Sequence, residues 1–131
     1  MRIWLLILFS IPAFSTEIGE ISELKGNGEI TRVNSSETFT AELDSDIFSF
    51  DDVRTGNGRL AIEFLDDSVV KLTEHSKLII DEYIFDPDPS KSKMSLQMAS
   101  GTARFISGAF GKINKENIII NTPTATIGIR G

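Results

Sequence analysis

Alternating apolar and polar residues recur along most of the chain after residue 16, and this pattern predicts β-strands. In the clearest run, residues 59–65 (RLAIEFL), Leu60, Ile62 and Phe64 fall on one face, and arginine, alanine and glutamate fall on the other. Period two is the side-chain spacing of a strand with one buried face. The turn at 66–68 (DDS) and the run 69–73 follow directly, so we expect a β-hairpin over residues 59–73.

Runs of the same kind predict roughly ten short strands spaced about 8–12 residues apart, which is typical of an all-β domain. The further runs lie at residues 17–25, 29–33, 39–43, 47–50, 77–83, 94–98, 103–105, 118–120 and 124–130. No long stretch after residue 16 has sustained helical periodicity. The pattern leaves open a sandwich, a barrel or a solenoid-like stack.

Two Gly-Asn-Gly sequences, residues 26–28 and 56–58, predict turns because glycine and asparagine tolerate positive φ. Each is followed by a charged residue and then an aliphatic one, which suggests a repeated coil. Ordinary turn chemistry used twice explains the two sequences as well. Pro123 lacks a ladder donor, so it marks a strand start or a corner before the last run.

The first fifteen residues have the pattern of a secretory signal peptide. Arg2 begins it, residues 3–11 are apolar apart from one serine, Pro12 breaks the run, and residues 13–15 (AFS) resemble an export-peptidase site. The apolar run is short for a membrane helix of about 20 residues. We expect cleavage after Ser15, which leaves residues 16–131 as one exported domain; a membrane anchor or a buried helix is the alternative.

Composition narrows the function further. The chain of 131 residues is 40% hydrophobic, long enough for one core, and carries a net charge of −6. Such a surface repels phosphate backbones, so nucleic acid is not an expected partner. Cysteine is absent, which excludes disulfides, thiolate metal sites and a lipoprotein anchor.

Few residues point to catalysis or metal binding. His75 is the single histidine, and it lies in a polar corner, Glu74-His75-Ser76, without a Gly-x-Ser-x-Gly elbow. We interpret it as an exposed turn residue, and zinc is excluded for want of ligands. Asp66 and Asp67 are interpreted as a solvated turn rather than an acid/base pair.

The remaining acidic clusters also favour turns over chemistry. Asp44, Asp46, Asp51 and Asp52 lie near one another, but they lack the EF-hand spacing of calcium sites. Residues 56–58 lack the third glycine and the helix of a dinucleotide site. We therefore expect that the protein binds no cofactor and is not an enzyme. Most phenylalanines are assigned to the core, with a few on loops as a contact patch.

A series of ordered motifs resembles the FecR domain family. The segments that carry the resemblance are DVRTG at 52–56, LAIEF at 60–64, DDS at 66–68, LIID at 78–81, GTARF at 101–105 and TPTATIGIRG at 122–131. The resemblance extends from about Gly19 to Gly131. The residues assigned to the family motif are Asp52, Thr55, Gly56, Asp66, Ser68, Gly101, Arg104, Thr122, Pro123, Gly128, Arg130 and Gly131.

The resemblance implies an exported all-β domain, solenoid-like in form, that acts in interaction or sensing rather than catalysis. In the regulators of this family, such a domain relays the state of an outer-membrane receptor to a sigma factor through a cytoplasmic anti-sigma segment. This sequence shows neither that segment nor a following membrane helix, which argues against direct sigma-factor control, so we expect a stand-alone exported FecR-like domain. The family pattern normally continues past the last glycine, which suggests a truncation at the C-terminus.

The sequence thus predicts a periplasmic or extracellular module that binds a protein or an envelope component through strand edges and loops, the terminal run 124–130 above all. Two alternatives remain. One is a carbohydrate- or small-ligand-binding β module, against which the lack of tryptophan after residue 15 counts. The other is a hydrolase that uses His75, Ser76 and a nearby aspartate.

Overall fold

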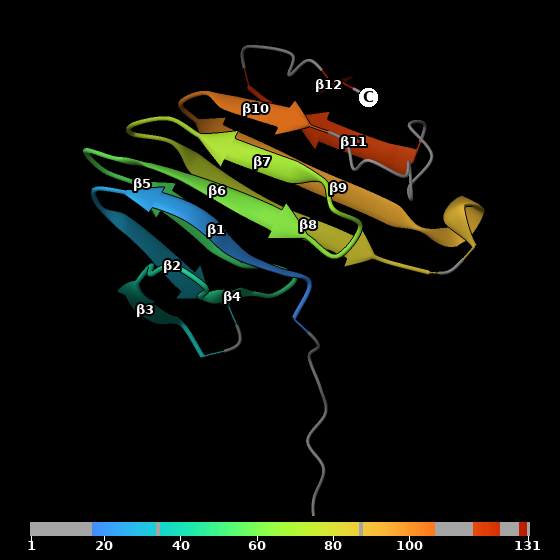
Figure 1. The fold of residues 1–131 in the computed structure, drawn as a ribbon, viewed down its shortest axis with the longest axis horizontal. Coiled ribbons are helices and arrows are strands. Elements are labelled where there is room, and N and C mark those ends of the chain that lie inside the picture. Colours follow the sequence, from blue (N-terminus) through green and yellow to red (C-terminus); the bar gives the residue numbers. More distant parts are fainter. Residues whose placement is uncertain (1–16, 34, 87, 107–116, 124–128, 131) are drawn as a thin grey trace, which may run out of the picture.

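The strands form two sheets whose buried faces meet, as Figure 1 shows for the computed structural model, which describes residues 17–33, 35–86, 88–106, 117–123 and 129–130. Sheet A has the order β12 (Ile129–Arg130), β10 (Ala103–Ile106), β7 (Val69–Leu72), β6 (Arg59–Phe64), β1 (Gly19–Lys25) and β4 (Asp46–Ile47). Sheet B has the order β11 (Ile118–Asn121), β9 (Lys93–Ser100), β8 (Lys77–Ile84), β5 (Asp52–Thr55), β2 (Gly28–Arg32) and β3 (Glu37–Thr40). A short 3₁₀ turn, η1 (Pro89–Lys91), precedes β9.

The core lies between the two sheets. Ile62 and Leu72 from sheet A and Ile80 and Leu96 from sheet B belong to one buried cluster. Each comes from a strand in which buried residues alternate with more exposed ones, so burial of one face stabilises each sheet. The all-β prediction is confirmed.

The arrangement fits a sandwich better than a solenoid. Eight strand pairings are antiparallel among the described residues, and two are parallel, β9 with β11 and β10 with β12. The parallel pairs share one repeat, because Met94 pairs with Ile118 and Phe105 with Ile129, 24 positions later in both cases. A coil of the solenoid kind is therefore limited to one end, and the solenoid-like expectation is not confirmed.

Several local predictions are confirmed. Strands β6 and β7 pair antiparallel as a hairpin, and the segment 17–25 forms a strand rather than a helical turn. The segment 124–130 is described only at β12, so its predicted alternation lies outside the described residues, as do the signal peptide at 1–15 and the loop at 107–116. Within the described part of the chain, no helix has the length and apolar character needed to cross a membrane.

The chain changes sheets at one end of the sandwich through corners that stack on one another. We call residues 26–28, 55–58, 73–76 and 101–102 the corner stack. Its backbone bonds run from Gly56 N to Asn27 O, from His75 N to Gly56 O, and from Thr73 N to Thr102 O. The two Gly-Asn-Gly turns are thus in direct contact. Each neighbouring pair of corners satisfies backbone groups that the strands leave unpaired.

Candidate functional site

Side-chain hydroxyls bind the corner stack together, and one of them belongs to the predicted motif residue Thr55. Its Oγ1 donates to Thr73 O at 2.6 Å and accepts from Ser76 N at 2.9 Å. The buried Ser76 Oγ in turn lies 3.1 Å from both the carbonyl oxygen and the amide nitrogen of Thr102. These bonds fix the corners against each other, which is a structural role.

The motif glycines Gly56 and Gly101 face very different surroundings in this stack. Gly101 has φ of 83°, a left-handed conformation that suits glycine, and a Cβ there would lie 2.6 Å from the Cβ of Ser76. At Gly56 a Cβ would meet its nearest atom, the Cβ of Asn27, at 3.8 Å. Glycine is therefore required by contact at Gly101 and not at Gly56.

Asp66 anchors a buried polar cluster at the tip of the β6–β7 hairpin. Its Oδ1 accepts from Ser68 Oγ at 2.6 Å and from Tyr83 OH at 2.7 Å, and the Asp66 N–H donates to the same phenol oxygen at 3.0 Å. Asp66 is 2% exposed and Ser68 is fully buried. The interpretation of Asp66 as a solvated turn residue is therefore wrong; it holds for Asp67, which is exposed and has the left-handed φ of 70°.

We expect Tyr83 to remain protonated above the pH at which a free tyrosine ionises. Burial, and then the bond to Asp66, raises the pKa of Tyr83. Since the unfolded chain ionises first, the stability that the protonated phenol contributes is complete below pH ~10 and falls above it, by up to about 1.4 kcal/mol per pH unit.

This expectation can be measured directly, because Tyr83 is the single tyrosine of the chain. Phenolate absorbance should rise only together with unfolding, as followed by circular dichroism. The Tyr83→Phe variant has no phenol to ionise, so its free energy of unfolding should fall less above pH ~10 than that of the parent. Ionisation near pH ~10 in a chain that is still folded would contradict the buried hydrogen bond.

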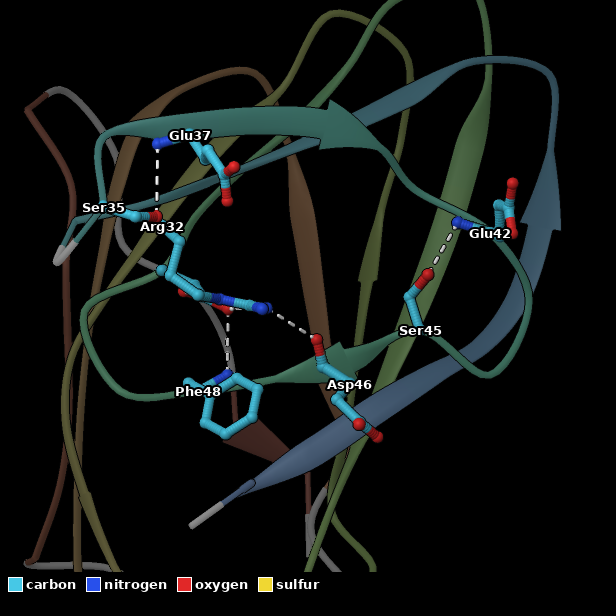
Figure 2. A network of polar contacts seen from close by, with 8 residues as sticks. Arg32, Ser35, Glu37, Glu42, Ser45, Asp46 and Phe48 are labelled. Carbon is cyan, nitrogen blue, oxygen red and sulfur yellow. Dashed lines mark hydrogen bonds and ion pairs between the residues drawn. The ribbon is translucent and has the colours of Figure 1, made fainter. Parts of the chain in front are cut away.

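A second polar network fixes β2 against the segment between β4 and β5 (Figure 2). The guanidinium carbon Cζ of Arg32 lies over the rings of both Phe39 and Phe48, at 4.8 and 4.4 Å from their centroids. Its Nε and Nη2 donate to the two carboxylate oxygens of the fully buried Asp51 at 3.1 and 3.0 Å, and Nη2 also donates to Asp46 O at 3.0 Å. The predicted motif residue Asp52 lies next to this network and forms ion pairs with Arg54 and Lys77.

The outer face of sheet A carries a groove lined by cations, which we call the cationic groove. Its volume is about 600 Å³. The charged residues that line it are Glu23, Lys25, Arg59, Lys71 and Arg104. They share one face, because the residues that alternate with them on these strands, Leu24, Leu60, Leu72 and Phe105, pack into the core. Arg104 is the predicted motif residue among them.

The structure gives the hydrolase alternative little support. The Ser76 hydroxyl is bonded to the backbone of Thr102, and the described residues offer the exposed His75 imidazole no hydrogen-bond partner. Groups of three or more potential metal ligands are likewise absent from the residues described.

The closing motif is only partly visible. Thr122 and Pro123 follow β11 of sheet B, and β12 belongs to sheet A. Gly128 and Gly131 lie outside the described residues, and Arg130 is described only as part of β12.

Comparison with known sequences decides the family. The profile of the FecR protein family matches residues 51–131. The chain belongs to the FecR family. Neither the curated proteins nor the solved structures gave a match. The FecR match begins at Asp51, later than the resemblance near Gly19, yet β1 and β2 complete both sheets by pairing with β6 and β5.

FecR proteins are regulatory rather than catalytic and typically act as sensors that face the periplasm. In this FecR chain, the motif residues Thr55, Asp66, Ser68 and Gly101 support the corners and the hairpin tip. The sequence did not predict a site at Lys25, Arg59 and Lys71. Alternation places each of them on the outward face of a strand, but it does not show that the three side chains lie together.

Proposed function

We propose that this protein is an exported, non-catalytic sensing module that binds a protein or envelope component through the edge of β11. The family supplies the regulatory class, and the pattern of residues 1–15 supports export. The edge of β11 is the observation that carries the binding role.

Strand β11 lacks the usual protection of a sheet edge. It is the last strand of sheet B, and within the described chain it pairs only with β9. Its sequence is Ile-Ile-Ile-Asn, with no charge, and Ile119 is 45% exposed. Charged residues normally guard such edges, and β11, which is as short as β3 at four residues, has none, so it suits the addition of a partner strand.

The opposite edge strand of the same sheet provides a contrast. Strand β3 contains Glu37, and its exposed Thr38 bonds Thr31 of β2 through their hydroxyls at 2.8 Å. This polar, charged edge disfavours pairing with another chain. The two ends of sheet B therefore differ in their readiness to bind.

The test is site-specific photo-crosslinking in the native cell envelope, with the reactive side chain at Asn121 of β11. We expect a discrete crosslinked product that Ile119→Lys reduces at least about tenfold, since a charge at an edge blocks strand pairing. The matched control, Thr38→Lys on β3, should leave the product unchanged. A product insensitive to Ile119→Lys, or no product at all, would refute binding at this edge.

A further inference from the structure

We propose that the cationic groove on sheet A binds a small ligand with two anionic groups, either carboxylates or phosphates. The site lies on β1, β6, β7 and β10, apart from the edge of β11. It goes beyond the proposed partner-binding function and does not depend on it.

The charge of the groove is opposite to that of the whole molecule. Four cations and one carboxylate line it, whereas the chain has a net charge of −6. The groove alone contributes +3, so all other residues sum to −9. A concave site lined by one sign of charge concentrates ligands of the other sign.

The pairing register places like charges directly opposite each other in this groove. Lys25 is the cross-strand partner of Arg59, and Arg104 is the partner of Lys71. Like charges in this arrangement destabilise a sheet. An anion held between the members of each pair would remove the repulsion, so the apo sheet bears a cost that a ligand relieves.

The carboxylate in the groove does not neutralise these pairs. Glu23 reaches Lys71 at 3.9 Å, and both side chains are exposed, which makes the ion pair weak. Among the residues that the structure describes, Lys25, Arg59 and Arg104 have no ion-pair partner. Three of the four cations are therefore available to a ligand.

Uncharged residues complete the lining of the groove. Besides the five charged residues, Leu24, Leu60, Leu72 and Thr73 line it. Its volume of about 600 Å³ is typical of small-ligand sites, which combine an apolar lining with a few polar or charged groups.

The two like-charge pairs define the ligand. Each contains one arginine, whose planar fork matches a carboxylate or phosphate, and one lysine as a point charge. From strand spacing and rise, the backbone positions of the two pairs lie roughly 12 Å apart, and long side chains bring the charges closer. A dianion with its groups at the ends of a short chain fits this arrangement.

Isothermal titration calorimetry at low salt tests the proposal with heptanedioate and tripolyphosphate as probes and acetate as the monoanion control. We expect saturable binding of one or both probes, each of which has an anionic group at either end, weakened by added salt, and no saturable binding of acetate. Heptanedioate bound at least as tightly as the more highly charged tripolyphosphate identifies carboxylate as the preferred group.

Substitutions distinguish a specific binding site in the groove from a general attraction of anions to positive charge. Arg59→Gln and Arg104→Gln should each weaken binding about tenfold or more, because each removes a charged hydrogen bond. They should leave the apo protein no less stable, since each relieves a like-charge pair. Glu23→Gln should tighten binding severalfold. Lys93→Gln, at a lysine on sheet B paired with Glu82 at 3.4 Å, should leave it unchanged.

Failure of this proposal is distinct from failure at the β11 edge. Absence of saturable binding by both probes, or equal loss in the Arg104→Gln and Lys93→Gln proteins, would overturn the anion site. Neither result would affect crosslinking at Asn121, and Ile119→Lys should not change probe affinity.

Discussion

Gly101→Ala should destabilise the protein by about 3–5 kcal/mol, the largest effect expected of any substitution considered. The φ of 83° places residue 101 in the left-handed region, where an alanine costs roughly 1–2 kcal/mol. The added Cβ would also lie 2.6 Å from the Cβ of Ser76 and closer still to its Cα and Oγ. Relief of that clash must move Ser76, whose hydroxyl joins two corners through Thr102.

Urea denaturation of the purified protein measures this effect. The matched control is Gly56→Ala, at a motif glycine in the same corner stack with a nearest contact of 3.8 Å and no positive φ. We expect the control to change stability by less than ~1 kcal/mol. If both variants unfold at the same urea concentration as the parent, the corner stack is not the rigid element described above. A Gly101→Ala chain that fails to fold would agree with the expected loss, because its added Cβ cannot avoid Ser76 without a shift of that residue.

The strands were predictable because alternation is a local property. Strand β6 shows it clearly, since buried Leu60, Ile62 and Phe64 alternate with outward residues whatever the rest of the fold does. The hairpin followed from the short turn between β6 and β7. The choice between a sandwich and a solenoid was not local, because it depends on which strands become neighbours.

The cationic groove could not be predicted for the same reason. Lys25 lies on β1 and Arg104 on β10, and β6 and β7 lie between these strands in sheet A. Only spatial order and register bring the four cations to one place. No spacing along the sequence carries that information, since side chains of neighbouring strands meet by pairing rather than by separation in sequence.

The buried Asp66, by contrast, did have a signal in the sequence. The inward positions of the hairpin are even-numbered, and Asp66 and Ser68 continue that series from Phe64 to Val70. Turn chemistry suggested solvent exposure instead, since aspartate favours turns. The partner that makes burial tolerable, Tyr83, lies on β8 of the other sheet and was not predictable from the hairpin alone.

The second large effect is expected from Asp66→Ala, which should cost about 3 kcal/mol. In the parent protein, the hydroxyls of Ser68 and Tyr83 both donate to one carboxylate oxygen of Asp66. The substitution removes that acceptor and leaves the two donors in a buried site. It also loosens Tyr83, whose ring stacks on Phe64 with centroids 5.1 Å apart and so joins the sheets. Unmet buried donors cost more than the net value of the bonds themselves.

The pair of neighbouring aspartates provides the control for this prediction. Asp67→Asn keeps a residue that tolerates the left-handed φ of 70° at an exposed position, so its urea midpoint should match that of the parent. Asp66→Asn retains one acceptor oxygen and should lose less than Asp66→Ala, which keeps the test informative if the alanine variant does not fold. Equal midpoints for Asp66→Ala and Asp67→Asn would show that the buried cluster does not stabilise the hairpin tip. The ordering expected from the contacts is parent and Asp67→Asn first, Asp66→Asn next and Asp66→Ala last, because each step removes more of the acceptor that Ser68 and Tyr83 share.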